Sequence, residues 1–280
     1  MEKALEKAKI LMQALPYIKE YHGKNVVIKF GGKAMNDPVM EQSIANDLAL
    51  MHFVGINPVV VHGGGPEISQ AMKNAGLKPN FINGLRVTDK QTMDFVTTVS
   101  GTICNQIVEN INKHGDFAAG FCGDLILAKE KDYPTLGFVG EVEKIKINEL
   151  NKALEDGFIP IISAIGKDST GEFYNINADT VAAAVAESLQ AEKLIYLTDV
   201  DGIYSNHEDR SSLISILTLK ESSELVKGKQ IAGGMLPKLL SCIEALKTGV
   251  HRCHILNGTA QHALLLEIFT DEGIGTMIKN

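Results

Sequence analysis

The chain has 280 residues, of which 45% are hydrophobic and 22% charged, a composition typical of a globular protein with a sizeable core. The net charge of −7 and the lack of a long basic run argue against nucleic acid as a partner. No apolar run reaches the length of a membrane span, and acidic residues near the N-terminus argue against a signal peptide. The four cysteines form no C-x-x-C pair, so we expect neither a zinc site nor a disulfide framework, and a reducing, cytoplasmic location.

Residues 1–22 carry apolar side chains at every third or fourth position, which predicts an amphipathic helix. Pro16 is expected to kink or split this helix. Because the helix precedes the first strand, it is an extension of the α/β pattern. It either folds back on its own domain or packs on another subunit as an arm, and the sequence leaves both open.

The apolar run Val26–Phe30 predicts the first strand. Lys29 lies near its C-terminal end, where ligands bind in open α/β sheets. A lysine within an apolar strand is costly unless its ammonium group meets an anion, so we interpret Lys29 as a ligand-binding residue rather than part of a solvated sheet edge. Asp37 and Pro38 are expected to begin a helix that ends near Val54.

A second apolar strand at residues 59–61 is followed by three glycines at 63–65, and then by a helix to about Ala75. Such a turn presents bare backbone N–H groups and the positive end of the helix dipole to an anion. A tight turn without a ligand would need one glycine rather than three, so we favour an anion-binding site.

The loop at residues 83–89 precedes another long helix, with Thr88 or Asp89 as its N-cap. Its Arg86 could hold a carboxylate through two parallel hydrogen bonds, although a solvent-facing arginine is the simpler interpretation of this loop taken alone. Residues 117–147 predict short strands and hairpins that could cover a substrate as a flap.

The second half returns to alternating elements. We expect a helix at 148–156, a strand at 158–163, a hairpin turn at 168–171 and a strand at 251–256, followed by a tail at 262–277.

Two segments of the second half carry more polar residues than their local structure requires. Asn175, Asn177 and Asp179 precede a helix at 180–189, and one N-cap would need only one of them. A polar loop at 198–202 follows the next strand, again at the C-terminal end where ligands bind.

Lys238 is predicted in the first turn of a helix that follows two glycines and ends near Lys247. A helix dipole disfavours a cation there, and such misfits are expected at functional sites. The sequence has no P-loop, no complete dinucleotide fingerprint and no protein-kinase signature. Two misplaced lysines, two glycine loops and an arginine nevertheless indicate a site for phosphate and carboxylate groups.

Six short motifs, in this order and spacing, resemble the amino-acid kinase family: Ile28-Lys29-Phe30-Gly31-Gly32, His62-Gly63-Gly64-Gly65, Asn83-Gly84-Leu85-Arg86-Val87-Thr88, Asn175-x-Asn177-Ala178-Asp179, Leu197-Thr198-Asp199-Val200-x-Gly202 and Gly234-Met235-x-x-Lys238. Each is weak alone, but together they span residues 24–280 and are specific. The resemblance implies a three-layer αβα sandwich around a mainly parallel, open central sheet, with an N-terminal helical extension. It further implies an arm at 1–24, an acceptor-substrate lobe at 25–174 and an ATP-binding lobe at 175–280.

Within the family, the pattern resembles the members that use ATP to phosphorylate the γ-carboxylate of N-acetyl-L-glutamate in arginine biosynthesis. This resemblance implies that Lys29 and Lys238 stabilise the transferred phosphoryl group and that Asp179 orients both lysines. The residues implied to bind the acceptor are Gly64, Gly65, Arg86 and Asn175, and those implied to bind the nucleotide are Gly31, Gly32, Thr198, Asp199 and Gly202. Mg²⁺ is expected on the ATP phosphates, with no metal site built from protein ligands alone.

The chemistry agrees with these residues, because a glutamate carboxylate with an ordinary pKa of about 4.3 is already ionised and needs no general base. Two alternatives remain open. One is a related kinase acting on another carboxylate, such as an aminoadipate derivative. The other is a non-catalytic amino-acid sensor, against which the retained Lys29, Asp179 and Lys238 argue.

The N-terminal helix and the tail resemble the members of the family that L-arginine inhibits. In those enzymes the N-terminal helices interlace three dimers into a hexamer, and arginine binds beside that helix and the C-terminal lobe. The resemblance implies that Glu267 receives the guanidinium group of arginine and that Gly273 makes a backbone contact with it.

Overall fold

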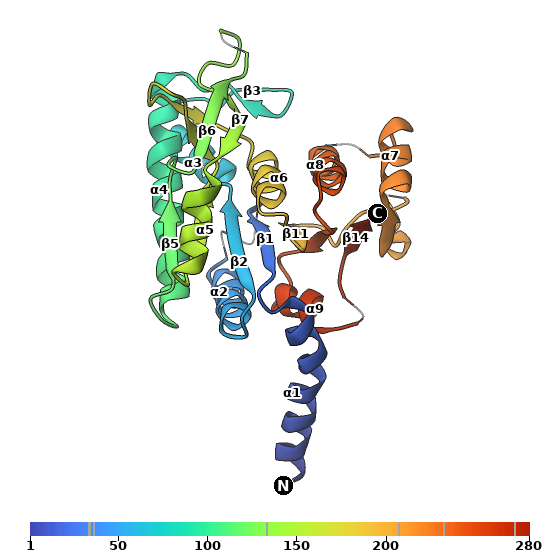
Figure 1. The fold of residues 1–280 in the computed structure, drawn as a ribbon. Coiled ribbons are helices and arrows are strands. Elements are labelled where there is room, and N and C mark those ends of the chain that lie inside the picture. Colours follow the sequence, from blue (N-terminus) through green and yellow to red (C-terminus); the bar gives the residue numbers. More distant parts are fainter. Residues whose placement is uncertain (33–34, 36, 133, 207, 232, 272) are drawn as a thin grey trace.

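The computed structural model covers residues 1–280, and the structure describes all of them except residues 33–34, 36, 133, 207, 232 and 272 (Figure 1). After a first helix, strands and helices alternate along most of the chain, as expected of an α/β protein. Among the helices of the described residues, none is both long enough and apolar enough to cross a membrane.

A central sheet of eight strands, counted over the described residues, follows the order β12-β14-β13-β11-β1-β2-β8-β5. Neighbouring strands are parallel except β13 and β14, so the sheet is mainly parallel and open, as the sequence predicts. In spatial order the strands are Ile216–Thr218, Thr276–Lys279, Arg252–Asn257, Lys193–Thr198, Asn25–Phe30, Asn57–His62, Ile159–Ser163 and Ala118–Phe121. The first strand of the sequence, β1, therefore lies in the interior of the sheet, between β2 and β11.

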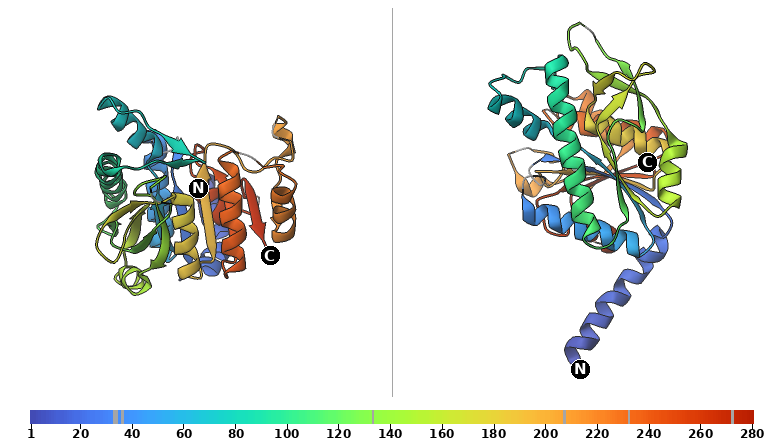
Figure 2. Two further views of the ribbon diagram at one scale, coloured as in Figure 1. Left: turned by 90° about the horizontal axis from the view of Figure 1, so that it is seen from above. Right: turned by 90° about the vertical axis from the view of Figure 1, so that its left-hand side faces the viewer.

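Helices cover both faces of this sheet and give the predicted three layers (Figure 2). One face packs against α2 (Pro38–Phe53), α4 (Lys90–Asn112) and α9 (Ala263–Phe269), and the other against α5 (Ile147–Glu155), α6 (Ala178–Ser188), α7 (Leu219–Lys227) and α8 (Met235–Lys247). The alternation of side chains along β1 explains the sandwich. Val26 and Ile28 join the apolar cluster of the first face, whereas Val27 joins that of the second.

Smaller strands gather beside the C-terminal ends of β2 and β8, at the top of Figure 1. They form a second sheet in the order β10-β9-β6-β7 and a short hairpin of β3 and β4. Their bounds are Phe173–Asn175, Ile165–Lys167, Ile126–Glu130, Gly140–Ile145, Phe81–Ile82 and Leu85–Arg86. Of the segment predicted to form a flap, β6 and β7 belong to this second sheet, whereas β5 is an edge strand of the central one.

The N-terminal helix α1 (Glu2–Tyr21) projects away from the sandwich at the bottom of Figure 1. Pro16 lies inside this helix without splitting it. Tyr21 at its C-terminal end is buried, and α1 contacts α9 there, but large apolar side chains farther from the sandwich are exposed: Leu5, Ile10, Leu11 and Met12. The helix therefore does not fold back on its own domain along its length.

Candidate active site

Lys29 and Lys238 meet at one carboxylate, that of Asp179. The Lys29 Nζ lies 3.3 Å from Asp179 Oδ1, and the Lys238 Nζ lies 2.7 Å from Asp179 Oδ2. The side chains of Lys29, Lys238 and Asp179 are only 11%, 14% and 9% exposed, so the group is largely desolvated. The structure thus brings together all three residues predicted to be catalytic.

Each of these three charged residues lies on a different element of the fold. Lys29 is the penultimate residue of β1, Asp179 lies in the first turn of α6, and Lys238 lies in the first turn of α8. The N-cap of α6 is Asn177, whose Oδ1 accepts from the Asp179 N–H at 2.9 Å. The buried Tyr196 hydroxyl donates to the Asp179 carbonyl oxygen at 3.1 Å. These two bonds hold the acidic residue where both lysines reach it.

Burial and mutual charge act against each other in this group. Burial lowers the pKa of Lys29, and Lys238 lowers it further, while Asp179 opposes both. Burial alone would raise the pKa of Asp179, but the two ammonium groups keep it below its ordinary value. Asp179 is therefore ionised at neutral pH, and its negative charge lets two cations share one nearly dry site.

Gly31 leaves the space that the Lys29 ammonium group occupies. A Cβ atom at Gly31 would come within 2.7 Å of Lys29 Nζ. Gly32, the next residue, has a φ of +75°, a backbone conformation that glycine adopts without strain. Gly31 therefore leaves room for the ammonium group, whereas Gly32 suits the backbone conformation of the turn.

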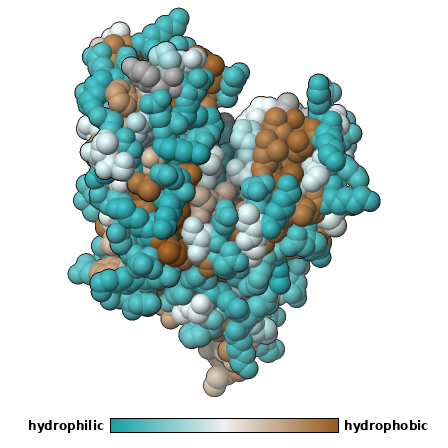
Figure 3. Space-filling view, turned by 45° about the horizontal axis from the view of Figure 1, so that its top comes forward, coloured by the Kyte–Doolittle hydropathy of each residue, from teal (hydrophilic) through white to brown (hydrophobic). Residues whose placement is uncertain are grey.

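The residues predicted to bind the acceptor line one cavity of about 160 Å³. Gly64, Gly65, Arg86 and Asn175 all face it, and so does Ala178, the residue before Asp179. The cavity therefore adjoins the charged group. In a space-filling view turned so that the top of Figure 1 comes forward, the surface is hollowed between the left and right halves of the molecule (Figure 3).

Arg86 is buried, contrary to the solvent-facing alternative. One guanidinium nitrogen, Nη2, donates to the Gly65 carbonyl oxygen at 2.7 Å and to the Ser69 hydroxyl at 2.8 Å, and the group lies 4.7 Å from the centre of the Phe81 ring. Burial lowers the pKa of Arg86. Its partners are neutral, and none of the described residues pairs a carboxylate with it, so the cation is available to an anionic ligand.

Asn175 lies at the end of β10, where its Nδ2 donates to the Thr88 hydroxyl at 3.1 Å. Asn175 thus links the second sheet to the Arg86 loop.

Of the two residues predicted as the N-cap of α4, the structure shows Asp89 in this role, because its carboxylate accepts from the Thr92 N–H.

The loop after β11 begins at the same edge of the sheet as Lys29. Lys29 pairs with Tyr196, and Thr198 and Asp199 follow two and three residues later. Gly202 is packed: a Cβ there would come within 2.5 Å of the Thr276 hydroxyl, and the N–H of the next residue, Ile203, donates to that hydroxyl. The absence of a side chain at Gly202 therefore allows the loop to pack against Thr276.

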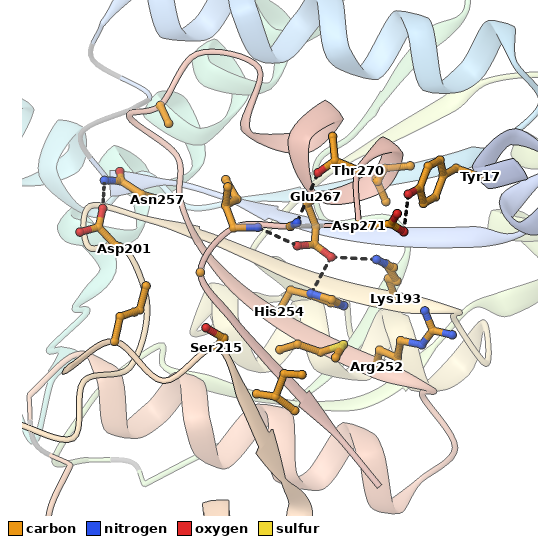
Figure 4. A pocket seen from close by; sticks show the side chains of 18 of the residues that line it. Tyr17, Lys193, Asp201, Ser215, Arg252, His254, Asn257, Glu267, Thr270 and Asp271 are labelled. Atoms are coloured by element: carbon orange, nitrogen blue, oxygen red, sulfur yellow. Dashed lines mark hydrogen bonds and ion pairs between the residues drawn. The ribbon is translucent and has the colours of Figure 1, made fainter. Parts of the chain in front are cut away.

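Glu267 and Gly273 line a different cavity, of about 690 Å³, between α1, α9 and β13 (Figure 4). The Glu267 Oε1 accepts from Lys193 Nζ at 2.8 Å and lies 2.8 Å from His254 Nδ1. Burial would raise the pKa of Glu267, but His254 and Lys193 lower it to about 2. Tyr17 of α1 donates to Asp271 at the rim, so the N-terminal helix closes one side of this cavity.

Lys193 and His254 were not singled out from the sequence, although both are buried functional candidates. Lys193 begins an apolar strand, so the argument that identified Lys29 could have identified it too. Among the described residues, no three His, Cys, Asp or Glu side chains are grouped so that they could hold a metal ion.

Comparisons with known proteins agree with this fold and site. The sequence profile of the amino acid kinase family matches residues 24–257. A relative named acetylglutamate kinase, from Carboxydothermus hydrogenoformans, is 49% identical over an alignment of 292 positions that covers 99% of each chain.

Two solved structures extend the likeness. N-acetylglutamate synthase from Neisseria gonorrhoeae, complexed with coenzyme A and N-acetyl-glutamate, superposes with a TM-score of 0.88 at 29% identity over 98% of this chain. The same enzyme complexed with coenzyme A and L-arginine gives a TM-score of 0.83 at 28% identity over 97% of this chain. The matches span 63% and 65% of the respective synthase chains. Profile, full-length identity and fold agree, and the chain therefore belongs to the amino acid kinase family of phosphotransferases.

Proposed function

We propose that this chain transfers the γ-phosphoryl group of ATP to the γ-carboxylate of N-acetyl-L-glutamate, giving ADP and N-acetyl-L-glutamate 5-phosphate in arginine biosynthesis. The observation that carries the proposal is the pair of lysines on Asp179 beside an Arg86-containing cavity. The relatives named acetylglutamate kinase, similar over their full length, support the choice of a carboxyl group as acceptor.

The reaction needs positioning and charge stabilisation more than proton transfer. The attacking carboxylate is already ionised, so the enzyme must bring two anions together and stabilise the phosphoryl group in flight. Lys29 and Lys238 supply positive charge on a nearly dry face, where removal of one such group costs about 3 kcal/mol of transition-state stabilisation. Asp179 keeps both ammonium groups at fixed positions before the substrates arrive.

The acceptor fits the cavity by charge. Arg86 can clamp the α-carboxylate, with Asn175 nearby, while the N–H groups of Gly64 and Gly65 bind the attacking carboxylate. None of the described residues lining the cavity is acidic. The ammonium group of free glutamate would lie near the positive Arg86 without a carboxylate to pair with it, which is unfavourable. An acylated nitrogen is neutral and avoids this cost.

ATP is proposed to bind across the edge formed by Gly31, Gly32 and the loop of Thr198, Asp199 and Gly202. Mg²⁺ would be carried by the nucleotide phosphates and would neutralise part of their charge. In this assignment residues 25–174 bind the acceptor and residues 175–280 bind ATP. The cysteines are free thiols, which suits a cytoplasmic location.

We further propose that L-arginine binds in the Glu267 cavity and inhibits the enzyme. The cavity carries acidic groups at Glu267 and Asp271 and basic groups at Lys193 and Arg252, which suit an amino acid with a cationic side chain. The structural likeness to a synthase complexed with L-arginine supports this choice. The exposed apolar side chains of α1 are proposed to interlace three dimers into a hexamer.

Release of ADP tests the proposal directly. Purified protein is given ATP, Mg²⁺ and N-acetyl-L-glutamate, with and without L-arginine, and hydroxylamine traps the acyl phosphate as a hydroxamate. Free glutamate and N-acetyl-aminoadipate serve as competing acceptors. We expect turnover with N-acetyl-L-glutamate, little with free glutamate, and inhibition by arginine. Faster turnover of the aminoadipate derivative would favour the related kinase, and absence of turnover with every acceptor would favour the sensor.

A further inference from the structure

Ser100 lies in the middle of α4 and lines the acceptor cavity. The residue is 6% exposed. Among the described residues, its hydroxyl makes no hydrogen bond, and it is not one of the unpaired polar atoms that are sealed from solvent. The small exposed area of Ser100 therefore includes an unpaired hydroxyl that a molecule in the cavity can reach.

Other hydroxyl groups of the same helix are paired within it. Thr97 Oγ1 donates to the Met93 carbonyl oxygen at 3.1 Å, and Thr102 Oγ1 donates to the Thr98 carbonyl oxygen at 3.0 Å. A carbonyl oxygen one turn earlier is a common partner of serine and threonine within helices. Serine is also a weaker helix former than alanine. Neither a local bond nor helix propensity therefore accounts for a hydroxyl at Ser100.

Ser100 lies on the face of α4 that meets the glycine turn after β2. A Cβ atom at Gly64 would lie 2.9 Å from Ile103 Cδ1, so α4 touches the turn at Ile103. Residues three positions apart are neighbours on one face of a helix, which places Ser100 on the face of Ile103. Gly64 and Ser100 also line the same cavity. The hydroxyl is thus near the backbone to which the attacking carboxylate is assigned.

The carboxylate assigned to this turn has more acceptor capacity than the turn supplies donors. The N–H groups of Gly64 and Gly65 offer two hydrogen bonds, whereas an ionised carboxylate has about four lone-pair directions on its two oxygens. One oxygen must keep a lone pair free to attack phosphorus, but the other can be bound more fully. A hydroxyl suits that second oxygen, because hydrogen bonds to charged groups are stronger than those between neutral groups.

We propose that Ser100 is a further substrate-binding residue, whose hydroxyl donates a hydrogen bond to the γ-carboxylate of the acceptor. This inference rests on the proposed function, because it adds a third donor to the place where Gly64 and Gly65 bind that group. By fixing the oxygen that does not attack, the Ser100 hydroxyl orients the oxygen that does.

Calorimetric titration of two ligands that differ in one group isolates this bond. N-acetyl-L-glutamate carries the γ-carboxylate, and N-acetyl-L-2-aminobutyrate is the same molecule without it. Both are titrated with Mg²⁺ and a non-hydrolysable ATP analogue present. The variants are Ser100→Ala, which favours the helix, and Ser100→Cys, which keeps a similar shape but donates weakly. Thr102→Ala is the matched control, because that hydroxyl is exposed and bonded within α4.

Ser100→Ala should weaken the binding of N-acetyl-L-glutamate about tenfold, and that of N-acetyl-L-2-aminobutyrate less than about twofold. Ser100→Cys should resemble Ser100→Ala, since the donor and not the volume is lost. Thr102→Ala should keep both wild-type Kd values. An unchanged Kd for N-acetyl-L-glutamate in Ser100→Ala, or an equal loss for the two ligands, would overturn the inference.

ADP release by the wild-type chain separates this inference from the proposed function. Binding of N-acetyl-L-glutamate without ADP release would contradict the proposed function, and the Kd values of the variants would still decide the role of Ser100. Turnover by the wild type together with an unchanged Kd in Ser100→Ala would leave the function intact and remove Ser100 from the site. Where both hold, kcat/KM for N-acetyl-L-glutamate should fall at least about tenfold in Ser100→Ala, with the KM for ATP unchanged.

Discussion

Lys29, Asp179 and Lys238 carry two positive charges and one negative charge, so the group as a whole is positive. Either lysine alone would form a neutral pair with Asp179. The charge of the second lysine is therefore left over and can interact with a ligand. The Asp179 carboxylate offsets the electrostatic cost of burying two cations.

Lys238→Ala should lower kcat by about 10²- to 10³-fold while changing the KM values little, because its charge acts on the transition state. Lys247→Ala, on the same helix but exposed, is the control and should behave as wild type. Steady-state kinetics measures both. A wild-type kcat in Lys238→Ala would remove this residue from the catalytic group.

Arg86→Lys should raise the KM for N-acetyl-L-glutamate about tenfold and leave the KM for ATP unchanged. Lysine keeps the positive charge but loses the planar pair of donors and the contacts that Arg86 makes with Gly65 and Ser69. The unaltered KM for ATP is the internal control. Equal affinity for the acceptor in both proteins would refute the clamp.

Glu267→Gln should remove a pH-dependent part of the stability. The pKa of Glu267 is about 2 in the folded chain and ordinarily 4.5, so its ionised form contributes about 3 kcal/mol above pH 4.5. This contribution is lost as the pH falls from 4.5 toward 2. Urea unfolding should therefore show a wild-type advantage at pH 6 that shrinks over this range, and a pH-independent difference would contradict the assignment.

Single residues were predictable from the sequence where they broke a local rule. Lys29 in an apolar strand and Lys238 in a first helical turn are such cases, and the structure joins them. Ser100 breaks no rule, because a serine can lie within a helix for many reasons. Its place on the cavity wall depends on neighbours from other elements, which one sequence does not reveal.

At the scale of elements, the backbone at the junction after β1 determines how much room the Lys29 ammonium group has. Gly31→Ala should lower kcat, since the new methyl group would meet Lys29 Nζ at about the distance where one of them must shift. Gly101→Ala, in α4 with open space around it, is the control and should stabilise the helix by up to about 1 kcal/mol. Thermal unfolding and kcat together separate the two effects, and an unchanged kcat in Gly31→Ala would show that the ammonium group tolerates the shift.

The elements with clear periodicity or caps were predictable, and those without were not. The helix beginning at Pro38 has its Asp37 cap as predicted, and the turn at 168–171 closes through the bond from the Asp168 N–H to Glu172. The sequence did not resolve α7, α9, β12 and β14. Of these, α9, β12 and β14 are short and are stabilised by packing on the rest of the sandwich, so their local pattern is weak. α7 is the exception, because Thr218 and Glu221 form a capping box at its start, a local signal that the sequence does carry.

At the scale of the whole molecule, α1 offers apolar surface that the rest of this chain does not cover. Deleting residues 1–15 keeps Tyr17 and the buried Tyr21 and removes most of that surface. We expect sedimentation to show a hexamer for the full chain and a dimer for the truncated one, with weaker inhibition by arginine. Lys9→Ala, which changes only an exposed charge, should stay hexameric, and a hexameric truncated chain would refute the arm.

The strand order is the part of the architecture that no motif encodes. The sequence predicts strands, a parallel sheet and ligands at the C-terminal edge, but only the fold places β1 between β2 and β11. That placement determines which loops face one another, because the glycine turn follows one neighbour of β1 and the Thr198 loop follows the other.

The interior position of β1 has a consequence for how the chain could be divided. A break in the surface turn at 168–171 would leave Lys29 and β1 on one fragment, and Asp179, Lys238 and β11 on the other. Each fragment would carry one of the two lysines, and the edges of β1 and β11 that pair in the intact sheet would be exposed. Reassembly of the two fragments would therefore register directly as recovered phosphoryl transfer, which makes this protein a natural candidate for a split reporter.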